Sequence, residues 1–245
     1  MNIKDFFDRI YIVNLPSRAD RRRWITSELK RVGLELTPGK IEIFPAIRPD
    51  HPGGFTSIGA RGCFLSHLEI LKKARQERLA NVLVIEDDLA ISNLLKSHEE
   101  ALVEKLQESD WGFLYLGHCH EFEKQPEQGV RLEPFIGELQ TTHFYGVNGP
   151  IVPELIEFLE QILERPPGHP DGGPMHVDGA YSRFREKHAA DIVTLITSPS
   201  LGSQAIYRSD ITTSWTDEAF ILKDLRNAAR KVRLHLRDLK RTIAG

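Results

Sequence analysis

The sequence has few cysteines and no long hydrophobic run. Its two cysteines, Cys63 and Cys119, lie far apart among 245 residues and form no CxxC pair. This scarcity argues against a disulfide scaffold and against a structural zinc finger, because both need several closely spaced thiols, and it points to a reducing compartment. No stretch approaches the roughly 18 consecutive apolar residues that a membrane-spanning helix requires.

An excess of positive charge is also missing. The formal net charge is −3, so the overall composition gives no reason to expect a nucleic acid partner. The first residues, MNIKDFFDRIYIVNLPS, carry acids at Asp5 and Asp8. They lack the continuous apolar core and small-residue cleavage site of a signal peptide. We therefore expect a soluble, cytoplasmic protein.

What the sequence does contain is enough apolar material for an ordinary globular domain. Hydrophobic residues make up 40% of the chain and charged residues 27%. Charge is unevenly distributed, since residues 221–245 hold eight basic and two acidic side chains. That segment carries +6, which leaves −9 for residues 1–220. We therefore predict one domain over 1–215 and a basic amphipathic helix over 216–245.

Short apolar segments rich in β-branched residues alternate with helical patterns. This alternation predicts an α/β fold in which helices cover both faces of a sheet. The stretch 117–139 has little periodicity and is interpreted as a surface loop or an active-site lid. For the helix over 17–32 we expect Ser17 or Asp20 as the cap. Strands are expected over 9–15, 40–47, 81–85, 111–116, 140–147 and 191–198, and helices over 17–32, 60–77, 92–107, 153–164, 178–187 and 217–241.

Three consecutive carboxylates, Glu86, Asp87 and Asp88, follow the apolar segment VLVI. We call them the acidic run. Adjacent carboxylates repel one another unless a cation or hydrogen-bond donors offset their charge. A divalent metal that also holds a diphosphate is one explanation. The start of a helix, where acidic side chains are favoured, is the other. The local pattern leaves both open, and acidic strand ends also occur in phosphohydrolases and kinases.

A wider set of motifs narrows these alternatives. In chain order they are IYIVNLPSRADRR at 10–22, GARGCFLSHLEIL at 59–71, VLVIEDDL at 82–89, THFYGVNGPIV at 142–152, VDGAYS at 177–182 and PSLGSQAIYRSDI at 199–211. With these motifs the sequence resembles glycosyltransferase family 25, which includes lipooligosaccharide galactosyltransferases and collagen galactosyltransferases. The resemblance implies a GT-A fold, a Rossmann-like mixed sheet flanked by helices. It also implies inverting transfer of a hexose, with galactose as the first candidate, from a UDP-sugar to a glycan or lipid-linked glycan.

The resemblance also implies roles for the acidic run. It places Asp88 as a direct ligand of Mn²⁺ or Mg²⁺, and Glu86 at the metal or at the donor ribose. Asp87 would contact the nucleotide-sugar. A divalent ion there would bridge the diphosphate and stabilise charge on the departing nucleotide.

Further nucleotide contacts are implied at two places. Asn14, Leu15 and Arg18 end the first predicted strand, where an amide can pair with a base edge and a guanidinium can bind phosphate. Arg21 shares the phosphate possibility with Arg18. Ser66 and His67 are implied to lie near the donor. The alternatives are a solvated face for the arginines of residues 18–23, preferred for Arg22 and Arg23, and a hydrogen-bonded core position for His67.

The transfer step needs a base that removes a proton from the acceptor hydroxyl. We assign this role to Asp178, with a helix N-cap as the alternative. His143, Tyr145 and Gln204 are candidates for the acceptor site, with ordinary strand packing as the preferred alternative for the first two. His176 is a weaker candidate for metal or acceptor.

One further cluster, His118-Cys119-His120, superficially resembles a set of metal ligands. Alternate residues of an extended chain point in opposite directions, so we do not expect the three to share a metal. Cys119 is instead expected to be a small buried hydrophobe.

Two other functions remain in competition with glycosyl transfer. A metal-dependent nucleotide-sugar phosphohydrolase or nucleotidyltransferase would use the same acidic run, and a catalytically silent glycan-binding domain would not need it. The predicted helix over 216–245 has a narrow heptad seam and basic outer faces. It can pack on the parent domain, dimerise, or attach the protein to the anionic inner face of a membrane.

Overall fold

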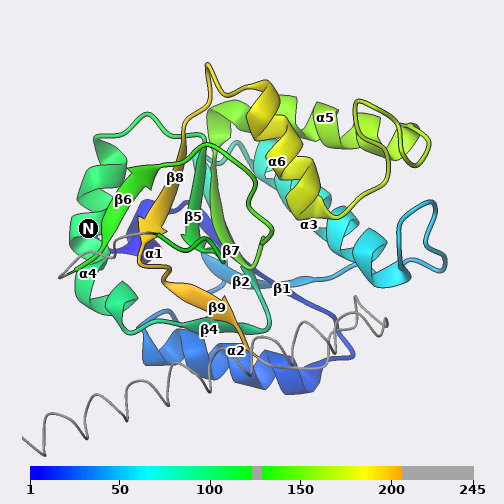
Figure 1. The fold of residues 1–245 in the computed structure, drawn as a ribbon. Coiled ribbons are helices and arrows are strands. Elements are labelled where there is room, and N and C mark those ends of the chain that lie inside the picture. Colours follow the sequence, from blue (N-terminus) through cyan, green and yellow to red (C-terminus); the bar gives the residue numbers. More distant parts are fainter. Residues whose placement is uncertain (123–128, 206–245) are drawn as a thin grey trace, which may run out of the picture. The chain divides into compact units, whose positions relative to one another are not determined.

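A computed structural model of the chain describes residues 1–122 and 129–205 (Figure 1). Its centre is a seven-stranded mixed sheet in the order β2-β1-β3-β7-β5-β8-β6. Five strands run parallel to one another, and β6 and β7 run antiparallel to their neighbours. The strands are β1 (Arg9–Asn14), β2 (Ile41–Pro45), β3 (Asn81–Glu86), β5 (Phe113–Gly117), β6 (Arg131–Pro134), β7 (Phe144–Asn148) and β8 (Thr194–Ser198).

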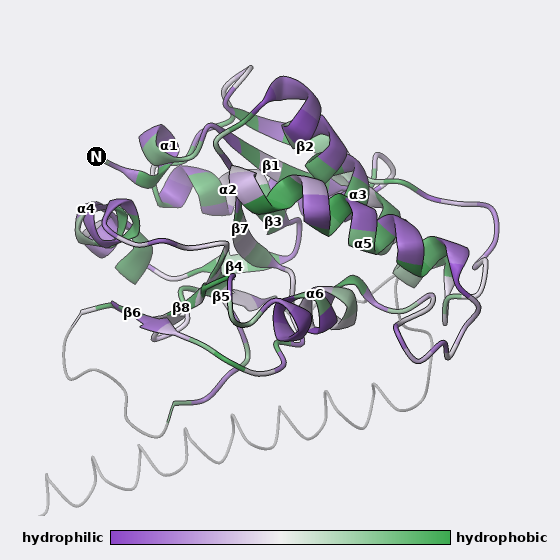
Figure 2. Cartoon of the chain, turned by 90° about the horizontal axis from the view of Figure 1, so that it is seen from above, coloured by the Kyte–Doolittle hydropathy of each residue, from purple (hydrophilic) through white to green (hydrophobic). Residues whose placement is uncertain are grey.

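Helices cover the sheet in two groups. The helices α3, α5 and α6 contact one another, while α1 contacts α4, and α4 also contacts β6. The helices α3 and α5 carry both hydrophobic and hydrophilic stretches, as expected for helices with one buried face (Figure 2). The helices are α1 (Ile3–Phe6), α2 (Ala19–Arg31), α3 (Ile58–Glu77), α4 (Leu94–Gln107), α5 (Val152–Glu164) and α6 (Val177–Lys187), with a 3₁₀ turn at Gly149–Ile151.

A two-stranded antiparallel ribbon lies below the main sheet in Figure 1. It pairs β4 (Leu89–Ile91) with β9 (Gly202–Gln204). The ribbon follows the acidic run directly, and the backbone N–H of Ala205 donates to the Asp88 carbonyl at 2.7 Å. It therefore ties the end of the described chain to the turn that holds the carboxylates.

The local sequence explains how the strands and α3 are placed. In β3 the apolar residues Val82 to Ile85 are all buried, as is typical of a strand covered on both faces. The Ser57 hydroxyl caps α3 by accepting from the Ala60 N–H at 2.9 Å. Gly62 lets α3 approach the chain after β2, because a Cβ there would lie 2.5 Å from the Ile47 carbonyl oxygen.

The expected fold class is confirmed: a mixed sheet is flanked by helices on both sides. Two local predictions are wrong. The helix expected over 17–32 has Arg18 as its N-cap residue, with no side-chain capping bond, so neither Ser17 nor Asp20 caps it. The acidic run does not start a helix, because a turn and β4 follow it and α4 begins only at Leu94.

The structure changes the bounds of two predicted segments, and one predicted helix lies outside the residues it describes. The stretch 117–139 contains the edge strand β6. The strand expected over 140–147 is confined to Phe144–Asn148. No helix in the described part of the chain is long and apolar enough to cross a membrane. The predicted helix over 217–241 and the boundary between 215 and 216 lie outside the described residues.

Candidate active site

The acidic run lies at the edge of the sheet where the parallel strands end. There β1, β2, β3, β5 and β8 all present their carboxyl ends. Because β7 runs the other way, the residues that precede it reach the same edge, and the Glu86 N–H donates to the His143 carbonyl at 2.9 Å. Ligands of open α/β sheets bind at this edge. The topology therefore gathers side chains from distant segments around three carboxylates.

One side of the acidic run is held by an internal cation. The Arg21 guanidinium contacts Asp87 Oδ1 at 3.0 Å and Asp88 Oδ2 at 3.3 Å, and Arg21 is only 8% exposed. Asn14 Nδ2 donates to Asp87 Oδ2 at 2.7 Å. Both oxygens of Asp87 are therefore satisfied. Asp88 Oδ1 is buried and has no hydrogen-bond partner. We call Asn14, Arg21, Asp87 and Asp88 the arginine side.

Asn14 is buried and fully engaged in this arrangement. Besides Asp87 it donates to the Arg18 carbonyl at 3.1 Å, and its Oδ1 accepts from Arg22 Nε at 3.0 Å. The amide thus fixes the turn after β1, while the half-buried Leu15 continues that turn. The prediction of a solvated face for Arg22 is wrong, because its guanidinium also binds the Pro16 carbonyl at 3.2 Å.

Two other arginines lie near Arg21 in sequence: Arg18, the N-cap residue of α2, and Arg23 within the helix. The Arg18 guanidinium forms a forked ion pair with Asp20, at 3.0 Å from Nε and 2.9 Å from the terminal nitrogen. This pairing holds the pKa of the Asp20 carboxyl well below its usual range. Arg23 is exposed, as predicted. The side chain that sequence reasoning failed to distinguish is therefore Arg21.

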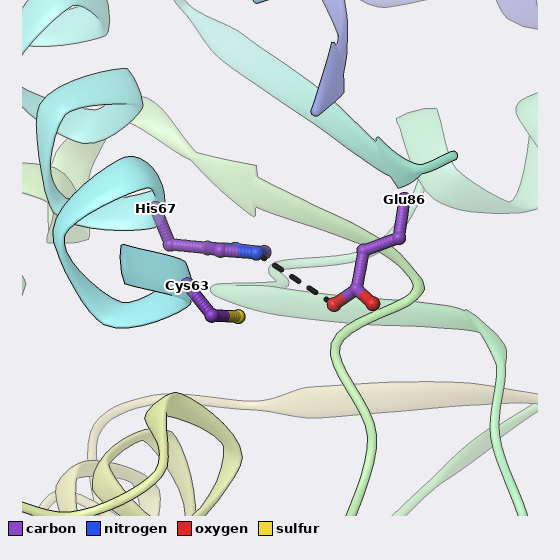
Figure 3. A group of neighbouring side chains, drawn as sticks. All are labelled: Cys63, His67 and Glu86. Carbon is purple, nitrogen blue, oxygen red and sulfur yellow. Dashed lines mark ion pairs between the residues drawn. The ribbon is translucent and has the colours of Figure 1, made fainter. Parts of the chain in front are cut away.

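The other side of the acidic run faces neutral groups. His67 Nδ1 lies 2.8 Å from the Tyr145 hydroxyl, and His67 Nε2 lies 3.7 Å from Glu86 Oε1 (Figure 3). Nε2 is buried without a hydrogen-bond partner. The Thr142 hydroxyl donates to Glu86 Oε1 at 2.9 Å. We call Cys63, His67, Glu86 and Tyr145 the histidine side.

Burial decides the charge state of this side. It raises the pKa of Glu86 to about 8, with a further contribution from Asp88, although Thr142 opposes the shift. Burial also raises the pKa of Asp88, against the opposing charge of Arg21. It lowers the pKa of His67 to about 3, so this imidazole is neutral near pH 7. The histidine side therefore favours a bound proton or another cation.

Asp178 faces the same space from α6. Its charge contributes to the raised pKa of Glu86 and to that of the Cys63 thiol, whose pKa burial raises most. The carboxylate is half-buried and accepts from the Gly179 N–H at 2.7 Å. The N-cap alternative for Asp178 is wrong, because His176 occupies that position. The exposed His176 ring lies 3.0 Å from the Thr56 hydroxyl.

Two other predicted site residues, His143 and Tyr145, are built into the interior. The buried Tyr145 hydroxyl is shared between His67 and Tyr181, 3.0 Å away. His143 Nε2 lies 3.3 Å from the Gly202 carbonyl oxygen, and burial lowers the pKa of His143 to about 4. Strand packing therefore describes His143 and Tyr145 better than acceptor contact.

Of the remaining two candidates, Ser66 is built into the interior and Gln204 is exposed. The Ser66 hydroxyl donates to the Gly62 carbonyl at 2.6 Å and accepts from the Ile47 N–H at 2.8 Å, so it fastens α3 to the chain after β2. Gln204 is exposed at the end of β9 and pairs in register with Leu89, directly after the acidic run. It remains accessible to a substrate.

The His118-Cys119-His120 segment does not form a ligand set. His118 Nε2 lies 2.6 Å from the Thr197 carbonyl oxygen, and the His120 ring packs edge-on against Phe122. Cys119 is exposed, so its prediction as a buried hydrophobe is wrong.

A different cysteine belongs to the site. In the described part of the chain, the group of three His, Cys, Asp or Glu side chains whose ligand atoms lie within 4.8 Å of one another is Cys63, His67 and Glu86. The sequence held a signal for it, since Cys63 and His67 are four apart on a predicted helix and so share a face.

The profile of glycosyltransferase family 25 (LPS biosynthesis protein) matches residues 7–144. The chain belongs to glycosyltransferase family 25. The match includes the turn after β1, the face of α3 that carries Cys63 and His67, and the acidic run. The family 25 motifs noted at 177–182 and 199–211, which hold Asp178 and Gln204, lie beyond it.

Curated relatives give the same family. Procollagen galactosyltransferase 2 is 30% identical over 142 residues in both mouse and human. The alignment covers 51% of this chain and 23% of each relative. The mouse protein named inactive glycosyltransferase 25 family member 3 is 24% identical over 244 residues, 87% of this chain and 41% of the relative. This chain thus spans well under half the length of the curated relatives it matches.

A solved structure was also similar. It is a glycosyltransferase involved in the glycosylation of the major capsid of PBCV-1, with a TM-score of 0.43 and 10% identity. The similar region covers 77% of this chain and 90% of that one.

Proposed function

We propose that this family 25 chain transfers a hexose from a UDP-sugar to a hydroxyl of a glycan or lipid-linked glycan, with inversion at the anomeric carbon. Galactose is the first candidate for the hexose. The observation that carries the proposal is the acidic run at the carboxyl edge of the sheet, with Asp88 Oδ1 buried and unpartnered. The relatives named as galactosyltransferases support the sugar.

The residues present fit a hard divalent cation. Carboxylate oxygens of Asp88 and Glu86 are the ligands that Mg²⁺ and Mn²⁺ prefer, and burial leaves both groups short of positive charge. Such an ion, when bound, would stabilise negative charge on the departing diphosphate. Arg21 and Asn14 would keep Asp87 and Asp88 in position for it.

The chain's own side chains would supply the other functions. Arg18 lies at the start of α2, where it can exchange its pairing with Asp20 for a phosphate. Asp178 would accept the proton of the acceptor hydroxyl while the sugar carbon is attacked from the face opposite the leaving group. Asp178 lies in the first turn of α6, and its charge contributes to the raised pKa of Glu86, which supports this role.

Two other functions compete with sugar transfer, and one of them is favoured by a relative's name. The name of the mouse relative, inactive glycosyltransferase 25 family member 3, favours a silent domain as the second candidate. A phosphohydrolase or nucleotidyltransferase would use the same carboxylates. We also propose that the transfer serves lipopolysaccharide biosynthesis in the cytoplasm. Residues 216–245 would then dock on the parent domain or a membrane, or form a dimer.

The test is a product analysis with labelled UDP-hexoses and an acceptor glycan array, with and without Mn²⁺. A transferase yields labelled glycan. A hydrolase yields free sugar or sugar phosphate, and a silent domain shows no metal-dependent affinity for UDP. Either of the last two outcomes would overturn the proposal.

Asp88→Asn gives the matching residue test. The change keeps size and removes charge, so transfer should fall at least about 10²-fold in Mn²⁺. The exposed Asp110→Asn is the control and should retain wild-type activity. If Asp88→Asn transfers as fast as the wild type, Asp88 is not the metal ligand.

A further inference from the structure

Two side chains of α3 and one from the end of β3 point to a common centre (Figure 3). Cys63 and His67 lie one helical turn apart and so project from the same face of α3. Glu86 approaches from the opposite side. The thiol sulfur, an imidazole nitrogen and a carboxylate oxygen all lie within 4.8 Å of one another.

The buried imidazole is the strongest sign of a ligand. His67 is fully buried, and its Nε2 has no hydrogen-bond partner although it is directed at Glu86. The distance from Nε2 to Glu86 Oε1 is 3.7 Å, longer than a hydrogen bond. Two ligands each about 2.1 Å from a tetrahedral zinc lie about 3.4 Å apart. The observed gap is therefore close to that of two groups sharing an ion.

The other ring nitrogen fixes the tautomer that metal binding needs. His67 Nδ1 lies 2.8 Å from the Tyr145 hydroxyl, which is 3.0 Å from that of Tyr181. When Nδ1–H donates to Tyr145, Nε2 carries a lone pair facing Cys63 and Glu86. A hydrogen bond from the second ring nitrogen is the usual support of a ligating histidine.

We propose that Cys63, His67 and Glu86 bind a zinc ion. Thiolate and imidazole select a borderline-soft ion, whereas the carboxylates of the nucleotide site select Mg²⁺ or Mn²⁺. On binding, the Cys63 S–H bond breaks and a sulfur–zinc bond forms, Glu86 gives up its carboxylic proton and binds through oxygen, and both protons leave to solvent. Cys63 and Glu86 are partly exposed, and water would fill the fourth position when zinc is bound.

This site would divide the acidic run between two ions. Glu86 would turn toward zinc, and Asp88 would remain the ligand for the cation that accompanies the donor. Zinc binding does not depend on the proposed sugar transfer. The two proposals can therefore fail separately.

Zinc content and a cobalt spectrum test the site. The full chain is loaded with Zn²⁺, dialysed, and measured for metal and protein. One zinc per chain is expected, lost in Cys63→Ser and retained in Cys119→Ser, the matched exposed cysteine. With Co²⁺ in place of zinc, a thiolate-to-cobalt charge-transfer band should appear in the wild type and in Cys119→Ser and disappear in Cys63→Ser.

Three results would overturn the proposal: no retained zinc in the wild type, equal retention in Cys63→Ser, or loss in Cys119→Ser. Circular dichroism melts of each variant separate loss of zinc from loss of fold. Glu86→Gln keeps both α3 ligands and supplies a second test, with zinc affinity expected to fall at least about 10-fold. Unchanged affinity in that variant removes Glu86 from the site.

Discussion

The two sides of the acidic run differ in what offsets the negative charge of their carboxylates. On the arginine side, one guanidinium contacts both Asp87 and Asp88. On the histidine side, Glu86 faces a neutral imidazole and a thiol. Burial raises the pKa of both Glu86, to about 8, and Asp88, but only at Asp88 does a neighbouring guanidinium, that of Arg21, oppose the shift. Adjacent residues thus differ in whether the chain itself supplies the opposing charge.

The difference follows from where β3 ends. Glu86 is the last residue of β3 and meets His67 of α3, whereas Asp87 and Asp88 lie in the turn that follows and both meet Arg21 of α2. On the arginine side the opposing charge is a permanent part of the chain. On the histidine side we expect the opposing charge to come from a proton or a bound metal ion.

The largest expected effect is on the chemical step. Asp178→Asn should lower turnover by about 10²–10⁴-fold, because the acceptor proton loses its base. Calorimetric UDP affinity should stay within a few-fold of wild type. Normal turnover with a lower melting temperature would make Asp178 structural, and a collapse of UDP affinity would move it into the donor site.

Arg21→Met breaks the arginine side. It leaves buried Asp87 without its cation, so the free energy of unfolding should fall by about 3–5 kcal/mol. Urea unfolding measures this, with the exposed Arg23→Met as control. Adding Asp87→Asn to Arg21→Met should recover part of the loss. A fall smaller than about 1 kcal/mol would show that the ion pair is not the main support.

Glu86→Gln tests the histidine side through the pH dependence of folding stability. Because the folded pKa of Glu86, about 8, lies above its ordinary value of 4.5, the folded state holds this proton more tightly than the unfolded state. Stability from this group is full below pH about 4.5 and is lost as pH rises through about 8. In EDTA, the wild type should therefore lose stability relative to Glu86→Gln across that range. Parallel curves would mean that Glu86 ionises normally.

The smallest expected effect comes from Thr142→Val. The Thr142 hydroxyl donates to Glu86 Oε1 at 2.9 Å, and a hydrogen bond of this kind contributes about 1 kcal/mol. Denaturant unfolding at pH 9, where Glu86 is mostly ionised, should show a larger loss than at pH 5. Equal losses at both values would show that the bond does not depend on the charge of Glu86.

Local patterns predicted much of this architecture. The β-branched segments of β1 and β3 and the carboxylates after β3 are strong signals because each depends on neighbouring residues alone. Short elements such as β4, β6 and β9 were missed, since their pairing partners are distant in the chain.

The inward arginine was missed for a related reason. Arg21 stands among similar arginines in RADRRR, so composition does not distinguish it. Its spacing does, because Arg21, Ile25 and Leu29 recur every four residues and are the buried face of α2. Recognition of Cys63 required the same helical spacing to be read together with Glu86, which no local pattern links to α3.

The placement of β7 between β3 and β5 has a consequence for folding. The contacts that define the site join residues far apart in the chain: 66 positions separate Arg21 from Asp87, and 78 separate His67 from Tyr145. Long-range pairings of this kind form slowly, because loop closure costs entropy before the contacts form. The Thr142 hydroxyl and the His143 carbonyl that contact Glu86, and the Tyr145 hydroxyl beside His67, reach the site only when β7 enters the sheet. A chain truncated before β7 would therefore lack the groups that hold Glu86, while Asp87 would keep Asn14 and Arg21.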